Sequence, residues 1–74
     1  MTTERVEEEA KRIVLDMLAG GRCSSLELRD EIGNRILTEM GLGVTSHLFN
    51  RAIRVLEKDK RVRWHPNLRL WSRV

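Results

Sequence analysis

Residues 45–74 read TSHLFNRAIRVLEKDKRVRWHPNLRLWSRV, and this part of the sequence is the most informative about the fold. Residues 61–74 alternate apolar and polar side chains with a period of two, which predicts two β-strands. The dipeptide Pro66-Asn67 between them is typical of a turn, so we expect an antiparallel hairpin. Thr45 or Ser46 is expected to cap a helix over residues 45–58. Its buried stripe would consist of Leu48, Phe49, Ala52, Ile53 and Leu56.

The loop length of this hairpin decides which side chains face the core. With a three-residue loop (residues 66–68), Trp64 would lie opposite Leu70 and face the core, while Trp71 would pair with Arg63 on the outer face. A two-residue loop would shift the register by one residue, and the sequence pattern permits both. Trp64 is therefore expected in the core, whereas Trp71 fits either packing against the first helix or an outward position.

Two further helices are predicted upstream. Residues 3–19 carry an apolar stripe at helical spacing and four glutamates near its start, and Gly20-Gly21 ends that helix. Ser24 and Glu27 have the spacing of a capping box, which begins a second helix that reaches about residue 39. Gly33 leaves open a break in the middle of this helix. Its apolar residues recur every four positions, at Leu28, Ile32, Ile36 and Met40.

Positive charge is concentrated in the second half of the chain. Residues 1–40 hold six Lys and Arg against nine Asp and Glu, whereas residues 41–74 hold eight against two. The overall formal charge of +3 therefore conceals a basic helix and hairpin, which favour a phosphate-binding surface. Arginines on an exposed helix face are also common as ordinary solvated surface.

Several classes of protein do not fit the sequence. A length of 74 residues predicts one domain, residues 1–74. The longest apolar run has three residues, and the first residues lack a signal-peptide pattern, so we expect a cytoplasmic protein (nucleoid-associated in a prokaryote) or a nuclear one.

Cys23 is expected to be a structural thiol. Because Cys23, His47 and His65 have unrelated spacings, the sequence predicts no metal or cofactor. We expect no enzyme, because no acid pair, activated nucleophile or glycine-rich phosphate loop is present.

The order of helix, short link, helix, turn, helix and basic hairpin resembles the winged helix-turn-helix superfamily over nearly the whole chain. The residues that carry the resemblance are the stripe Ile13-Val14-x-x-Met17-Leu18, the link Arg22-Cys23, the opening Ser24-Ser25-Leu26-Glu27-Leu28, the pattern Phe49-x-x-x-Ile53-x-x-Leu56, and Trp64…Leu70-Trp71. The resemblance implies an α+β fold, mainly α, with a three-helix bundle and a small antiparallel β-hairpin wing. It also implies that Arg22-Cys23 forms a minimal extra strand against the wing. The stretch over residues 24–43 is longer than the family's compact helix and turn, which indicates an extended second helix or an insertion.

The resemblance also implies binding to duplex DNA by a small transcriptional regulator, with the third helix in the major groove and the wing on the backbone. The expected base contacts are Ser46, His47, Asn50, Arg51 and Arg54. The expected phosphate contacts are Lys58, Arg61, Arg63, Arg69 and Arg73, with His65 and Asn67 near the minor groove. A second phosphate site would use Ser24 and Ser25 at the start of the second helix. The alternatives are a protein-interaction module within a larger assembly and RNA binding through the same face; a homodimer also fits.

Overall fold

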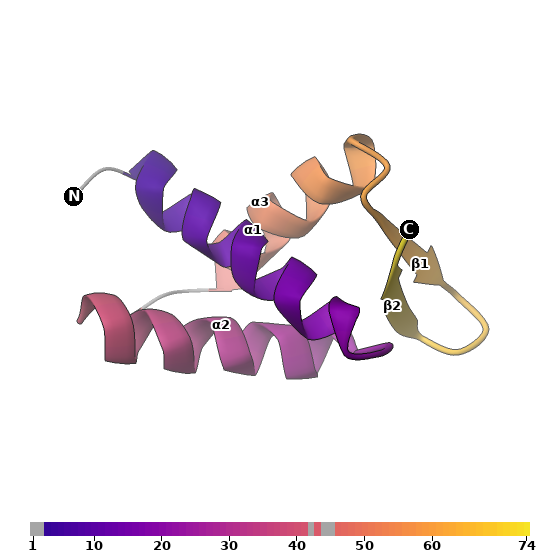
Figure 1. The fold of residues 1–74 in the computed structure, drawn as a ribbon, viewed down its shortest axis with the longest axis horizontal. Helices are drawn as coiled ribbons and strands as arrows, with labels where there is room; N and C mark the ends of the chain where they lie inside the picture. Colours follow the sequence, from indigo (N-terminus) through magenta and orange to yellow (C-terminus); the bar gives the residue numbers. More distant parts are fainter. Residues whose placement is uncertain (1–2, 42, 44–45) are drawn as a thin grey trace.

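The computed structural model describes residues 3–41, 43 and 46–74. Three helices are followed by a two-stranded antiparallel hairpin, so the protein has the expected mainly helical α+β fold with a winged-helix-like topology. The helices pack on one another, and the hairpin lies at one end of a body with extents of 36 × 21 × 19 Å (Figure 1). The elements are α1 (Thr3–Ala19), α2 (Ser25–Met40), α3 (Ser46–Lys58), β1 (Val62–His65) and β2 (Leu70–Arg73).

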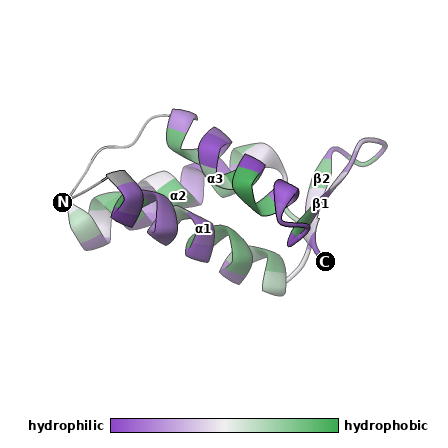
Figure 2. Ribbon diagram, turned by 90° about the horizontal axis from the view of Figure 1, so that it is seen from above, coloured by the Kyte–Doolittle hydropathy of each residue, from purple (hydrophilic) through white to green (hydrophobic). Residues whose placement is uncertain are grey.

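The core is formed where the three helices meet and where the hairpin closes against them. Both hydrophilic and hydrophobic residues occur along each helix, as an amphipathic pattern requires (Figure 2). Most residues of the expected apolar stripes are buried, whereas Val6, Met17, Met40 and Leu48 are partly buried and pack against the core. The buried residues are Ala10, Ile13, Val14 and Leu18 of α1, Leu28, Ile32 and Ile36 of α2, Phe49, Ala52, Ile53 and Leu56 of α3, and Cys23, Val62 and Trp71.

Helix α2 begins and ends with recognisable caps. The Ser24 Oγ accepts from the Glu27 N–H at 3.2 Å, and the Glu27 Oε1 accepts from the Ser24 N–H at 3.2 Å, so the expected capping box is confirmed. The helix runs without a break through Gly33 to Met40. It ends because Gly41 adopts a left-handed conformation (φ 68°).

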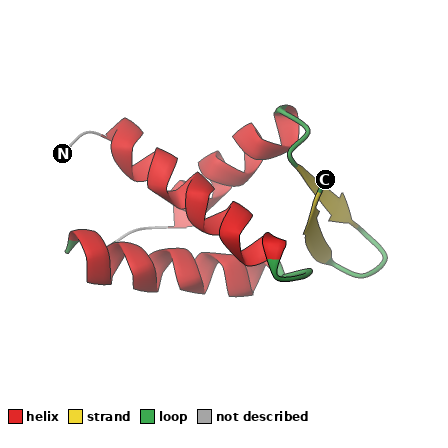
Figure 3. Cartoon of the chain, viewed as in Figure 1, coloured by secondary structure: helices red, strands yellow, loops and turns green. Residues whose placement is uncertain are grey.

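The hairpin register differs from both expected alternatives. His65 pairs with Leu70 and Trp64 pairs with Trp71, which leaves a four-residue loop over residues 66–69 (Figure 3). The expected pairing of Arg63 with Trp71 on the outer face is therefore wrong, since Arg63 lies opposite Ser72. The extra loop residue arises because the His65 carbonyl accepts from two successive N–H groups, those of Leu68 (3.2 Å) and Arg69 (2.8 Å).

Trp71 joins the hairpin to the helices. It is buried, its Nε1 donates to the Ser25 Oγ at 2.9 Å, and its ring lies 4.9 Å from the half-buried Trp64 ring. Cys23 and Trp71 also exchange two backbone hydrogen bonds, of 3.1 and 2.7 Å. This antiparallel bridge is the minimal extra strand expected of the 22–23 link, although only Cys23 takes part in it.

Candidate nucleic-acid interface

The outer side of α3 carries a row of basic and polar side chains. His47, Arg51, Arg54 and Lys58 are all exposed, and their spacing of four, three and four residues places them on the side opposite the buried stripe. Asn50 is exposed as well. The predicted face of this helix is therefore present. The side chain of Ser46 and the expected N-terminal cap of α3 lie outside the described residues.

A tight turn carries this basic row into the hairpin. The Arg61 N–H donates to the Leu56 carbonyl at 2.9 Å and the Lys60 N–H to the Glu57 carbonyl at 3.0 Å, the two bonds of a Schellman motif. Lys60 is left-handed (φ 60°) in the position where glycine is usual. Because this turn is short, the cations of α3 and of β1 lie on neighbouring segments.

The hairpin adds four exposed cations: Arg61, Arg63, Arg69 and Arg73. Asn67 is exposed in the loop, as expected. His65 is not at the tip: it ends β1, is half-buried, and its Nε2 lies 2.6 Å from the Ser72 Oγ. Arg69, like Lys60, has a left-handed backbone (φ 54°) that favours glycine. The sequence analysis did not identify Lys60 as a site residue, and its signal was only its position in the run Asp59-Lys60-Arg61.

Among the described residues, ion pairs are concentrated in α1 and α2, although the structure gives none to Arg22 or to Arg29. In α1 and α2, Lys11 pairs with Glu8 (2.6 Å), Arg35 pairs with Glu31 (3.0 Å), and Arg12 pairs with Glu9, Asp16 and Glu39. The hydrogen bond from Arg12 holds the pKa of Glu9 below its usual value, against the opposing effect of burial. Over residues 46–74, in contrast, the structure gives no salt bridge to Arg54, Lys58, Lys60, Arg61, Arg63, Arg69 or Arg73. These seven cations are uncompensated, so they are available to an external anion.

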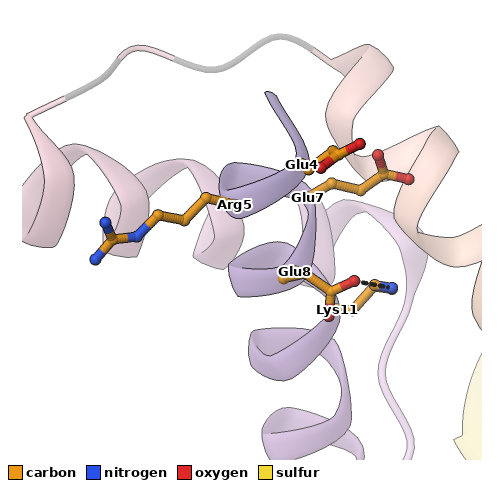
Figure 4. Close-up of a pocket in the computed structure, with 5 residues that line it drawn as sticks. All are labelled: Glu4, Arg5, Glu7, Glu8 and Lys11. Atoms are coloured by element: carbon orange, nitrogen blue, oxygen red, sulfur yellow. Dashed lines mark ion pairs between the residues drawn. The ribbon is translucent and has the colours of Figure 1, made fainter. Parts of the chain in front are cut away.

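Arg51 is the exception on α3. Its Nη2 lies 3.8 Å from the Glu7 Oε2 of α1, and the Glu7 side chain is only 17% exposed. Glu4, Arg5, Glu7, Glu8 and Lys11 line a shallow hollow on this part of α1, where Glu8 and Lys11 form an ion pair (Figure 4). The Glu7 carboxylate lies beside α3, so the electrostatic potential is less positive on the α1 side of the basic row.

The expected second phosphate site at the start of α2 has competing internal contacts. The Ser24 Oγ accepts from the Glu27 N–H, and the Ser25 Oγ accepts from Trp71 Nε1. The Glu27 carboxylate also occupies the N-terminus of the helix, where a phosphate would otherwise be stabilised. The geometry thus gives these two serines a structural role in capping α2 and fixing the hairpin.

Two further features of the described residues concern the Cys23 thiol and the side chains that could hold a metal ion. Burial raises the pKa of the Cys23 thiol, and the Glu27 carboxylate adds to this, so the thiolate is disfavoured. Within residues 3–41, 43 and 46–74, no group of three or more His, Cys, Asp and Glu side chains is placed to hold a metal ion. No described helix is both long and apolar enough to cross a bilayer.

The chain was compared with protein-family models, with curated proteins and with solved structures, and no match was found.

Proposed function

We propose that this protein binds duplex DNA as a small transcriptional regulator, with α3 in the major groove and the hairpin along the backbone. One observation carries the proposal: the cations of α3 and the hairpin are exposed and largely unpaired, whereas Lys11, Arg12 and Arg35 in α1 and α2 are neutralised by carboxylates. Unpaired cations on a helix and the adjoining hairpin can displace counterions from phosphates, which supplies the affinity. The proposal includes membership of the winged helix-turn-helix superfamily, no enzymatic activity, and action in the nucleoid or the nucleus.

Within this proposal the residues of α3 have two tasks. Arg51 and Arg54 suit base edges because a guanidinium donates two hydrogen bonds to guanine, and Asn50 suits adenine. His47 would lie near them at the start of the helix. Lys58, Arg61, Arg63 and Arg73 suit phosphates at the end of α3 and along the hairpin. The Glu7 carboxylate would hold Arg51 on the α1 side of the helix until a base or phosphate replaces it.

The test is a titration of a fluorescent random-sequence duplex with the protein at roughly 50 and 200 mM salt. About six phosphate contacts would lower the affinity by roughly three orders of magnitude between these two salt concentrations. Competition with duplex RNA and with single strands then identifies the preferred nucleic acid. Absence of binding at the lower salt concentration would contradict the proposal.

Arg69 allows a test in which stability and binding change in opposite directions. Arg69→Gly removes a cation and also relieves a left-handed backbone, so we expect the free energy of unfolding to rise by up to about 1 kcal/mol. For the same variant, the slope of the logarithm of the DNA-binding constant against the logarithm of the salt concentration (the salt slope) should become shallower by about one unit. Urea unfolding and the duplex titration measure the two effects. Unchanged DNA binding by a more stable variant would show that Arg69 does not contact phosphate.

Exposed leucines favour a second candidate function, docking to a protein partner. Leu26 and Leu37 are 56% and 58% exposed on the outer side of α2, away from its buried stripe. Such a function would persist at high salt, since apolar contacts are not screened. Loss of a partner or of a dimer on replacing both leucines with serine, without loss of DNA binding, would support it.

A further inference from the structure

The loop of the hairpin presents an apolar side chain at its tip. Leu68 is 51% exposed, and the loop that carries it projects beyond the helices (Figure 2). The other large apolar side chains exposed in the described part of the chain are Leu26 and Leu37 on α2 and Val74 after β2. Leu68 differs from them because it sits in a loop between two strands, where a side chain could reach into a narrow groove.

The backbone around Leu68 is constrained by hydrogen bonds and by Pro66. The His65 carbonyl accepts from the Leu68 N–H and from the Arg69 N–H, and Pro66 fixes one backbone angle at the start of the turn. Below the loop, the His65 ring contacts the Ser72 hydroxyl at 2.6 Å, and the two tryptophans join the strands to the core. Because these contacts hold Leu68 in place before binding, the loop loses little conformational entropy when it enters a groove.

The chemistry around Leu68 points to a polyanion with an apolar interior. Residues 60–74 contain five Lys and Arg and no Asp or Glu. Arg69 is adjacent to Leu68 in the chain, and Arg63 extends the positive charge along β1. Stacked base pairs behind a phosphate backbone have this combination of charge and apolar interior. Architectural proteins use leucine in this manner, as a wedge that enters the minor groove and unstacks a base step.

We propose that Leu68 is such a wedge: it enters the minor groove, separates two base pairs and bends the duplex, while Arg69 neutralises the adjacent phosphate. This inference rests on the proposed DNA binding and adds to it a deformation of the DNA. Pyrimidine–purine steps such as TA unstack most easily, so the protein should favour sites with such a step under the loop. The preference would arise without a hydrogen bond to any base edge.

The test measures bending separately from binding. A short duplex labelled at both ends for energy transfer is titrated with the wild type, with Leu68→Ser and with Leu37→Ser. Leu37 is a matched control because it is equally apolar and 58% exposed but lies on α2. Since both replaced side chains, Leu68 and Leu37, are exposed, the two variants should fold, and circular dichroism checks this.

We expect the wild type and Leu37→Ser to raise the energy transfer and to prefer a TA-containing duplex by roughly 5- to 20-fold over a duplex of the same composition without the step. Leu68→Ser should bind random duplex within about threefold of the wild type, because the cations remain, but should neither bend it nor prefer the TA step. Wild-type binding without bending, or equal bending by Leu68→Ser, would overturn the inference and leave DNA binding intact. Binding to anionic phospholipid vesicles that is lost in Leu68→Ser, with no bending of DNA, would overturn it in favour of a bilayer. No binding of the wild type to any duplex would refute the proposed function itself.

Discussion

Replacing Arg51, Arg54 and Arg63 together with alanine should weaken binding to random-sequence duplex by roughly 100- to 1,000-fold at about 100 mM salt. Each phosphate contact contributes close to one order of magnitude at this salt concentration, because one condensed counterion is released for each phosphate neutralised. On random-sequence duplex, which has no preferred site, Arg51 and Arg54 are expected to contact phosphates as Arg63 does, so the salt slope should fall by about three units. If Arg51 and Arg54 also contact base edges, replacing each with alanine should reduce the binding free energy at the preferred site by a further loss of roughly 1–3 kcal/mol.

A charge-matched variant makes this experiment specific. Arg12, Arg29 and Arg35 replaced together with alanine also reduce the formal charge by three, from +3 to 0. These residues lie on α1 and α2, where Arg12 and Arg35 are already paired with carboxylates. If DNA is bound through α3 and the hairpin, the matched variant should keep an affinity within about tenfold of the wild type. Equal losses in the two variants would show that net charge alone governs binding and that no particular face is used.

Trp71→Ala should lower the free energy of unfolding by about 3–5 kcal/mol. A domain of this size has a stability of roughly 4–11 kcal/mol, so this one replacement should remove a large part of it. The indole of Trp71 fills the space between the hairpin and the helices, donates to Ser25 and lies against Trp64. Urea unfolding followed by circular dichroism measures the loss, and Trp64 fluorescence follows the hairpin separately.

Two control variants separate the contributions of Trp71. Trp71→Phe keeps an aromatic ring and loses the hydrogen bond to Ser25, which should cost about 0.5–1.5 kcal/mol for the bond itself. Trp64→Ala removes the half-buried member of the pair and should cost less than Trp71→Ala. The opposite order would mean that Trp64 faces the core and Trp71 faces outward, as a three-residue loop would require.

The comparison between Trp64 and Trp71 shows where sequence reasoning reached its limit. The alternation of residues 61–74 predicted both strands and their turn, but it did not give the length of the loop. A shift of one residue in the register moves Trp71 from the outer face to the core. The register is fixed by contacts with distant residues: the backbone bridge to Cys23 and the hydrogen bond to Ser25, 46 residues away.

For the candidate interface, the sequence predicted which side chains are exposed but not their partners. The helical period predicts the exposure of His47, Arg51, Arg54 and Lys58, because the apolar residues of the same helix must face the core. The Glu7–Arg51 contact joins α1 to α3, so it depends on how the two helices cross. The internal roles of Ser24 and Ser25 likewise depend on the capping box and on the docked hairpin. The exposure of Leu68 depends on the four-residue loop that the observed register leaves between the strands.

Local sequence patterns are enough to predict the helices, the strands and the side of each helix that faces the core. Helix periodicity, the capping box at Ser24 and the glycines after α1 and α2 act over a few residues, so they can be read without knowledge of the fold. The hairpin register, the burial of Trp71 and the contact of Arg51 with Glu7 are set instead by tertiary packing. Each of these depends on contacts between segments far apart in the chain, and such contacts form only when the helices and the hairpin pack around one core.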